Sequence, residues 1–260
     1  MEENLVISKN NFGKTFYKTC IYFVFYSFIG FLLETIFGLF SKGVIESRQS
    51  FLFGPFCAIY GIGAILMIAF LKNFKGRPVL IFLLGALIGT VAEYLMSYFC
   101  DVFLHFKWWD YTGYFLNING RTCLYFTVLW GLLAIALIEY VNPFFNKVLN
   151  KISESKYSKM AKILFNIVMV ILVFDIILTT VALRLFYLKL DEDFNVSNNS
   201  SGYNTSRLYY TVNNDLDLIS EENMLRIYPN IRVTDYKNNT IFVDSLYKGV
   251  KTYYIKLFEK

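Results

Sequence analysis

The chain has 260 residues, of which 56% are hydrophobic and only 17% charged, and its mean hydropathy is +0.44. This composition excludes an ordinary soluble protein and indicates a polytopic membrane protein. The formal net charge of +5 comes mainly from lysines and arginines between the apolar runs. Such charge suits anionic lipid and gives no reason to expect nucleic-acid binding.

Long apolar runs predict about five transmembrane helices. A spanning helix needs roughly 20 predominantly apolar residues. The first run is too long for the core of a signal peptide and no small-residue cleavage site follows it, so we expect a retained helix. The predicted spans cover residues 19–41, 49–71, 78–100, 122–141 and 163–186.

The lysines and arginines also predict the orientation in the membrane. They gather in the N-terminal arm and in the second and fourth connections between spans. Since cytoplasmic loops carry the excess of positive charge, we expect a cytoplasmic N-terminus and an external C-terminus.

Two of the apolar runs contain a glutamate at a matched position. Glu34 and Glu93 each follow a glycine by four residues (Gly30 and Gly89) and precede the next charged residue by eight. Eight helical residues rise roughly 12 Å, so both carboxylates are expected in the outer half of the membrane. An acidic side chain at the centre of a spanning helix costs about 2.5–3.5 kcal/mol on insertion scales and is a functional-site candidate.

Each glutamate belongs to a stripe of small and polar residues spaced four apart, which share one helix face. One stripe is Gly30, Glu34, Gly38 and Lys42, and the other is Gly85, Gly89, Glu93, Ser97 and Asp101. We expect the stripes to face each other or a shared cavity, with Arg48 and Arg121 entering from the same side. One interpretation is a charge-paired site that binds or gates a substrate. The other is structural, with buried Glu–Arg pairs that fix the helix register.

Three further segments could belong to such a site. Gly54 and Pro55 could open a broken or re-entrant entry to the second span, where Gly61 and Gly63 allow close packing; a tightly packed helix is the alternative. The aromatic loop 105–114 predicts an interfacial anchor through residues such as Trp109, or a lid over the glutamates. In the same loop Asp110 could pair with Arg121, and Asp175 lies in the middle of the fifth span.

No common catalytic or metal-binding motif is present. The sequence lacks a P-loop, a Gly-x-Ser-x-Gly motif, a His-Glu-x-x-His motif and a Cys-x-x-Cys pair, and it has one histidine. We therefore expect no enzyme activity, no catalytic residue, no metal and no cofactor. The candidates for binding or gating are Glu34, Glu93, Arg48, Arg121, Asp110, Ser97 and Asp175. The candidates for packing are Gly30, Gly54, Pro55, Gly61, Gly63, Gly89 and Trp109.

The remainder of the chain predicts a small extramembrane module. The transmembrane domain covers residues 1–188, a polar linker covers 189–206, and 207–260 form an external α+β module. In it, Ser220 begins a short helix over 220–227 as an N-cap. The expected strands lie in 207–212, 231–236, 240–247 and 252–258. The fold class is thus an all-α polytopic membrane protein with a small C-terminal α+β module.

Residues 16–145 resemble a family of bacterial membrane proteins, the CmpB-type "putative ABC-transporter permease" family. The motifs that carry the resemblance are Gly30-x-x-x-Glu34, Phe51-Leu-x-Gly-Pro-x-Cys-x-Ile-Tyr-Gly-x-Gly-Ala64, Glu93-Tyr94-x-x-Ser97, Trp108-Trp-Asp-Tyr111, Asn119-Gly-Arg121-x-x-Leu124 and Trp130-Gly131. The chain departs from the family at residues 48–50, which read Arg-Gln-Ser where members often read Asn-Arg-Gly. It also has Ala58 in place of a common proline. The resemblance implies a permease in the bacterial cell membrane that works with a separate ATPase.

Three functions remain open. The first is a transporter subunit in which Glu34 and Glu93 bind a cationic or polar substrate, or protons. The second is a non-transport membrane scaffold or assembly factor whose external module binds envelope partners. An intramembrane enzyme with the glutamates as acid and base ranks last, because the sequence supplies neither a nucleophile nor a metal shell. Five spans are few for a monomeric pathway, which favours a homo-oligomer within the lipid bilayer.

Overall fold

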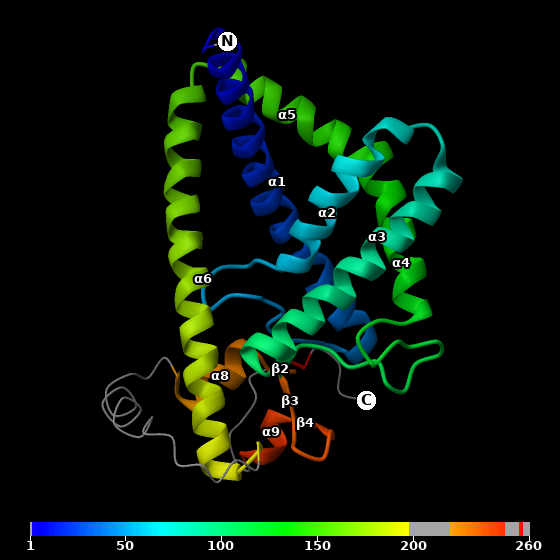
Figure 1. Ribbon diagram of the computed structural model, residues 1–260, viewed down its shortest axis with the longest axis vertical. Helices are drawn as coiled ribbons and strands as arrows, with labels where there is room; N and C mark the ends of the chain where they lie inside the picture. Colours follow the sequence, from blue (N-terminus) through cyan, green and yellow to red (C-terminus); the bar gives the residue numbers. More distant parts are fainter. Residues whose placement is uncertain (1, 198–218, 248–254, 257–260) are drawn as a thin grey trace. The chain divides into compact units, whose positions relative to one another are not determined.

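The computed structural model describes residues 2–197, 219–247 and 255–256, and helices dominate it (Figure 1). The helices are α1 (Glu2–Lys42), α2 (Ala58–Leu71), α3 (Pro78–Phe99), α4 (Leu124–Ala136), α5 (Asn142–Glu154), α6 (Ser158–Phe194), α8 (Glu221–Ile227) and α9 (Val243–Leu246). The strands are β1 (Val44–Ile45), β2 (Phe106–Lys107), β3 (Arg232–Thr234), β4 (Thr240–Phe242) and β5 (Ile255–Lys256). A 3-10 turn follows α2 at Lys72–Phe74, and π turns follow α3 at Cys100–Leu104 and α4 at Leu137–Val141.

The protein is a polytopic membrane protein, as its composition predicts. Among the described residues, four helical segments are long and apolar enough to cross a membrane: Gly13–Lys42, Pro78–Leu104, Leu124–Glu154 and Ser158–Phe194. The segment Ala58–Phe74 is also apolar but shorter. The four long segments correspond to the first, third, fourth and fifth predicted spans, and the shorter segment covers part of the second. Many of their large apolar side chains are exposed, as a lipid-facing surface requires.

The second predicted span differs from the structure, because α2 begins only at Ala58 and residues 49–57 form bends and extended backbone. Gly54, in the middle of this segment, has a φ of 80°, and Pro55 follows it. Proline cannot continue an intrahelical hydrogen-bond ladder, and a left-handed glycine breaks it. The apolar run 49–71 therefore combines a non-helical entry with a short helix.

The chain divides into two compact units, and helices α1, α3, α4 and α6 pass from one to the other. The first unit contains the chain up to Phe31 together with Pro55–Ala92 and Phe126–Val173. Inside this unit, glycines allow close approach: Gly30 lies against the ring of Tyr60, and Gly63 and Gly89 lie against Trp130. Because a Cβ at Gly30 or Gly89 would collide with these rings, the two positions require glycine.

The second unit contains Leu32–Gly54, Glu93–Tyr125 and the chain from Phe174 onward. Its two small sheets are antiparallel: β2, β3 and β4 form one in that order, and β1 pairs with β5. The strand that follows α1 and the strand that follows α3 each pair with a strand from the C-terminal segment. The C-terminal strands thus complete sheets that begin in the membrane domain.

One hydrophobic core joins the parts of the second unit. Its buried members come from the entry to α2, from β2, from the last turns of α6 and from the C-terminal segment. They are Leu52, Phe106, Ala182, Leu183, Phe186, Leu190, Val196, Ile219, Met224, Leu225, Tyr228, Ile231, Val233 and Val243. The predicted polar linker 189–206 is helical as far as Phe194, because Leu190 is fully buried in this core.

The predicted short C-terminal helix and parts of three predicted strands agree with the structure. Ser220 caps α8 by accepting a hydrogen bond from the Asn223 backbone nitrogen, which confirms the predicted short helix. Strands β3, β4 and β5 lie within three of the four predicted ranges, although 240–247 continues as helix α9 after Phe242. The predicted strand 207–212 lies outside the described residues.

Candidate functional site

The loop between α3 and α4 folds back on itself beside the polar face of α3. Backbone nitrogen of Tyr111 donates to the Gly120 carbonyl at 2.8 Å, and the indole nitrogen of Trp109 donates to the Arg121 carbonyl at 2.8 Å. Gly120 has a φ of 66°, and a Cβ there would collide with the Asp110 carboxylate. The turn at Asn119-Gly120-Arg121 therefore requires glycine at its middle position. This turn brings Tyr111, Arg121 and Thr122 to α3.

Glu93 is the most buried acidic side chain of this region, with 5% of its surface exposed. Both carboxylate oxygens accept hydrogen bonds from the loop. The Tyr111 hydroxyl donates to Oε1 at 3.2 Å, and the Thr122 hydroxyl donates to Oε2 at 2.8 Å. Both donors are neutral hydroxyl groups.

Glu34 acts on the same tyrosine. Burial is the largest cause that raises the pKa of Tyr111 well above its usual value, followed by the charges of Glu93 and Glu34. The Tyr111 hydroxyl thus stays protonated and is available as a donor. Glu93 and Glu34 thus both add negative charge to the surroundings of the Tyr111 hydroxyl.

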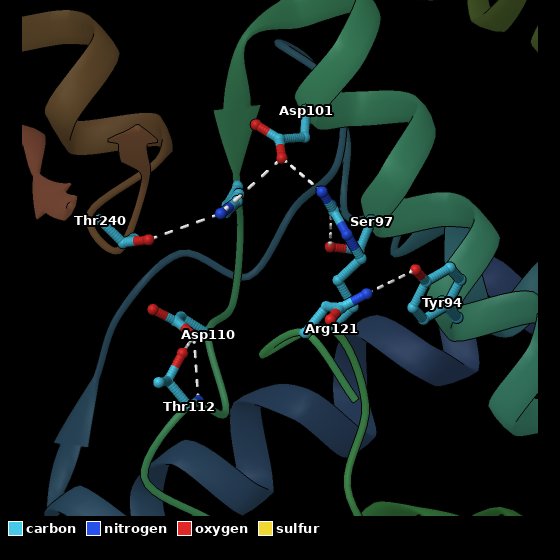
Figure 2. Close-up of polar contacts among 9 residues, drawn as sticks. Tyr94, Ser97, Asp101, Asp110, Thr112, Arg121 and Thr240 are labelled. Atoms are coloured by element: carbon cyan, nitrogen blue, oxygen red, sulfur yellow. Dashed lines mark hydrogen bonds and ion pairs between the residues drawn. The ribbon is translucent and has the colours of Figure 1, made fainter. Parts of the chain in front are cut away.

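Arg121 reaches from the loop to Ser97 and Asp101, which follow Glu93 by four and eight residues (Figure 2). Its guanidinium donates to Asp101 at 2.6 Å and to the Ser97 hydroxyl at 3.3 Å, and it lies over the ring of Tyr98. Lys107 adds a second cation 3.7 Å from the Asp101 carboxylate. Glu93 and Ser97 lie four residues apart on α3, Asp101 lies in the π turn that follows it, and all three bond residues of the folded loop.

Asp110 does not form the predicted pair with Arg121. Its carboxylate accepts hydrogen bonds from the backbone nitrogen and the hydroxyl of Thr112 in its own loop (Figure 2). Burial acts to raise the pKa of Asp110, but these hydrogen bonds and the charges of Arg232 and Lys107 outweigh it, so the pKa lies below its usual value. Asp110 thus forms hydrogen bonds within its own loop, whereas Arg121 bonds Ser97 and Asp101.

Arg48 binds a different acidic residue from the one expected. It pairs with Glu46, which also accepts from Lys42 at 3.0 Å. Burial acts to raise the pKa of Glu46, yet hydrogen bonds from Asn230 and Lys42 and the charge of Arg48 lower it overall. The guanidinium lies beside Gly38, one turn beyond Glu34 on the same helix face. Arg48 thus lies along the predicted stripe, in an ion pair with Glu46.

Asp175 bonds the non-helical backbone that precedes α2. Its carboxylate accepts from the Phe53 backbone nitrogen at 3.2 Å, and the Thr179 hydroxyl accepts from the Leu52 backbone nitrogen at 2.9 Å. Both side chains are at most 5% exposed. Non-helical backbone at membrane depth needs such partners, because lipid supplies none.

The two stripes do not face each other through their glycines. Gly85 and Gly89 pack against Ala134 and Trp130 of α4, and Gly30 packs against Tyr60 of α2. Small residues allow helices to approach closely wherever a bulky partner lies opposite, and here the bulky partners belong to neighbouring helices. These glycines therefore pack against neighbouring helices and not against the other stripe. Gly61, another packing candidate, lies against Ser27 and Phe23 of α1.

Sequence reasoning missed Tyr111, Thr122 and Lys107 as members of this constellation. Tyr111 stands in the Trp-Trp-Asp-Tyr motif, and Thr122 follows the Asn-Gly-Arg motif directly. For Tyr111 and Thr122, the position in or next to these motifs is the sequence feature that could have identified them as site residues.

The comparisons with known proteins agree with the motif resemblance. A family model described as "Putative ABC-transporter type IV" matches residues 21–180, which include α2, α3, α4, α5, the site loop and Asp175. No curated protein and no solved structure matches the chain.

Proposed function

Because the chain belongs to the family described as "Putative ABC-transporter type IV", we propose that it is the membrane-spanning permease subunit of a transporter. The polar site of this subunit consists of Glu93, Tyr111 and Thr122, and we include Glu34 because its charge helps to raise the pKa of Tyr111. The observation that carries the proposal is the buried Glu93 carboxylate, which two neutral hydroxyls hold within a membrane-spanning segment.

The charge of this site points to the substrate class. An ionised carboxylate at membrane depth is costly and marks ion or substrate pathways by default. Two carboxylates that act on one tyrosine favour a cationic substrate or protons. Both carboxylates would repel an anionic substrate.

Arg121 and Asp101 form the boundary of the site toward the loop. Asp101 lies eight residues beyond Glu93, which is roughly 12 Å along the helix. The ion pair between Arg121 and Asp101, at 2.6 Å, connects the loop to the C-terminal end of α3, beyond Glu93. Breaking it would release the loop, so we assign Arg121 and Asp101 to gating and Ser97 to the same network.

The proposal implies an ATPase partner, because the chain has no P-loop. It also implies a bacterial cell membrane, with the N-terminus and the lysine-rich connections in the cytoplasm. In this orientation the site lies in the outer half of the bilayer, and the C-terminal sheets lie outside.

A comparison of cell contents tests the site assignment. A strain that lacks the chain is complemented with wild type, Glu93→Gln or the exposed control Glu154→Gln, and small cations and metabolites are measured by mass spectrometry. We expect Glu93→Gln to reproduce the contents of the deletion strain and Glu154→Gln to match wild type. If Glu93→Gln restores wild-type contents at equal membrane levels, the site assignment is wrong.

A second function is favoured by the shared core of the second unit. The C-terminal segment contributes Met224, Val233 and Val243 to a core that also contains Phe106 and Phe186. A module so firmly built onto the membrane domain suits a scaffold or assembly factor that presents this surface to envelope partners. In that case Glu93→Gln leaves cell contents unchanged, whereas substitutions on the exposed side of β4 remove function.

A further inference from the structure

Helix α5 continues a membrane-spanning helix beyond the thickness of a bilayer. The helical segment Leu124–Glu154 has 31 residues. At roughly 1.5 Å per residue it exceeds the hydrocarbon core of about 30 Å by roughly half. Helix α4 is far more apolar than α5, which begins directly after the π turn at Leu137–Val141 and has Pro143 in its first turn. Figure 1 shows α5 inclined to α4 and running toward the start of α6. Helix α5 thus lies at the membrane boundary.

One side of α5 is fixed to α1. The hydroxyl of Tyr22 donates to the Asn146 side chain at 2.7 Å, and that of Tyr26 donates to Asn142 at 3.1 Å. Between these bonds, the rings of Phe25 and Phe145 stack with their centroids 3.7 Å apart. These contacts belong to the first unit and give α5 a defined orientation.

The opposite side of α5 is basic, with one large apolar side chain. Phe144 is 66% exposed, and the exposed Lys147 and Lys151 follow it by three and seven residues, on the same helix face. The next turn and the start of α6 add three exposed lysines, Lys156, Lys159 and Lys162. Glu154 is the one acidic residue between Asn142 and Lys162.

We propose that α5 and the turn after it bind the head groups of anionic phospholipids. The ammonium groups of Lys147 and Lys151 contact the lipid phosphate, and Phe144 enters the boundary between head groups and acyl chains. A helix with this pattern lies in the interface plane, and each lysine near an anionic surface strengthens binding. The choice of lipid over a protein partner follows from this charge complementarity and from the direct continuation of α5 from a membrane span.

Native mass spectrometry of the purified chain in mild detergent tests the proposal. The chain is titrated with palmitoyl-oleoyl phosphatidylglycerol or with the zwitterionic phosphatidylcholine of the same acyl chains. The test variant is Lys147→Gln/Lys151→Gln, and the control is Lys72→Gln/Lys75→Gln, which removes two exposed lysines after α2. Circular dichroism and thermal unfolding establish that both variants fold.

We expect wild type and the control to retain phosphatidylglycerol in preference to phosphatidylcholine. The α5 variant should bind phosphatidylglycerol roughly 30-fold more weakly, since each lysine near an anionic surface contributes a factor of about five and the variant loses two lysines. An equal loss in the control would mean general attraction without a site on α5 and would overturn the proposal. Unchanged lipid binding would also overturn it, and if a co-purifying cytoplasmic protein were lost instead, α5 would be a protein-docking surface.

Discussion

At the residue scale, Glu93 depends on two hydroxyl donors that come from one loop. Tyr111 and Thr122 approach it from either side of the Asn-Gly-Arg turn. The helical spacing of Glu93, Ser97 and Asp101 could be predicted from the sequence, because positions four apart share a face. The donors could not, because their approach depends on how a loop of irregular structure folds.

Replacement of Tyr111 by phenylalanine should destabilise the protein. The change removes one hydrogen bond to a buried carboxylate, and such bonds contribute roughly 1.5–3 kcal/mol. Thermal unfolding in detergent should therefore show a lower midpoint for Tyr111→Phe. The control Tyr140→Phe alters a hydroxyl on a side chain that is 72% exposed and should leave the midpoint unchanged. Equal midpoints for all three proteins would contradict the role of Tyr111.

Gly120 provides a second test at this scale. Alanine there would place a Cβ against the Asp110 carboxylate and hold a left-handed φ, so the Asn-Gly-Arg turn should open. Limited proteolysis of the detergent-solubilised protein should then cut Gly120→Ala in this loop faster than wild type. Gly113→Ala, in the same loop, adds a Cβ with nothing within 4 Å and should behave as wild type. Identical digestion of both variants would refute the requirement for glycine.

At the element scale, the entry to α2 shows where hydropathy misleads. The run 49–71 is apolar enough to span, yet its first part is not helical. Gly54 and Pro55 signal a break, so a broken entry and a continuous helix are both compatible with this sequence. The partners of the freed backbone nitrogens could not be predicted, since Asp175 and Thr179 lie more than 120 residues further along the chain.

The contact between Thr179 and Leu52 gives a matched pair of variants. Thr179→Val removes the acceptor of the Leu52 backbone nitrogen and a donor to Asp175. A buried donor without a partner costs roughly 1–3 kcal/mol, so this variant should unfold at a lower temperature. Thr180→Val, at the neighbouring exposed position, removes only a bond to its own helix and should change little. Similar midpoints for the two variants would show that Thr179 does not support the broken entry.

At the scale of the whole molecule, the C-terminal segment is part of the architecture of the membrane domain. Its helix and strands were predictable locally from a capping serine and from alternation. Their pairing was not, because β3 pairs with β2 and β5 pairs with β1 over long sequence separations. The matched glutamates were the strongest whole-chain signal; Glu93 accepts a hydrogen bond from Tyr111, and the charges of both glutamates help to raise the pKa of that tyrosine.

The most direct test of the permease assignment is purification of the tagged full chain from native membranes in mild detergent, with mass spectrometry of the proteins that co-elute. We expect a P-loop ATPase in a fixed ratio to the chain. The ATPase should also co-elute with Glu93→Gln, since that substitution lies within the polar site. Absence of any ATPase, with envelope proteins retained instead, would contradict the permease assignment and support the scaffold.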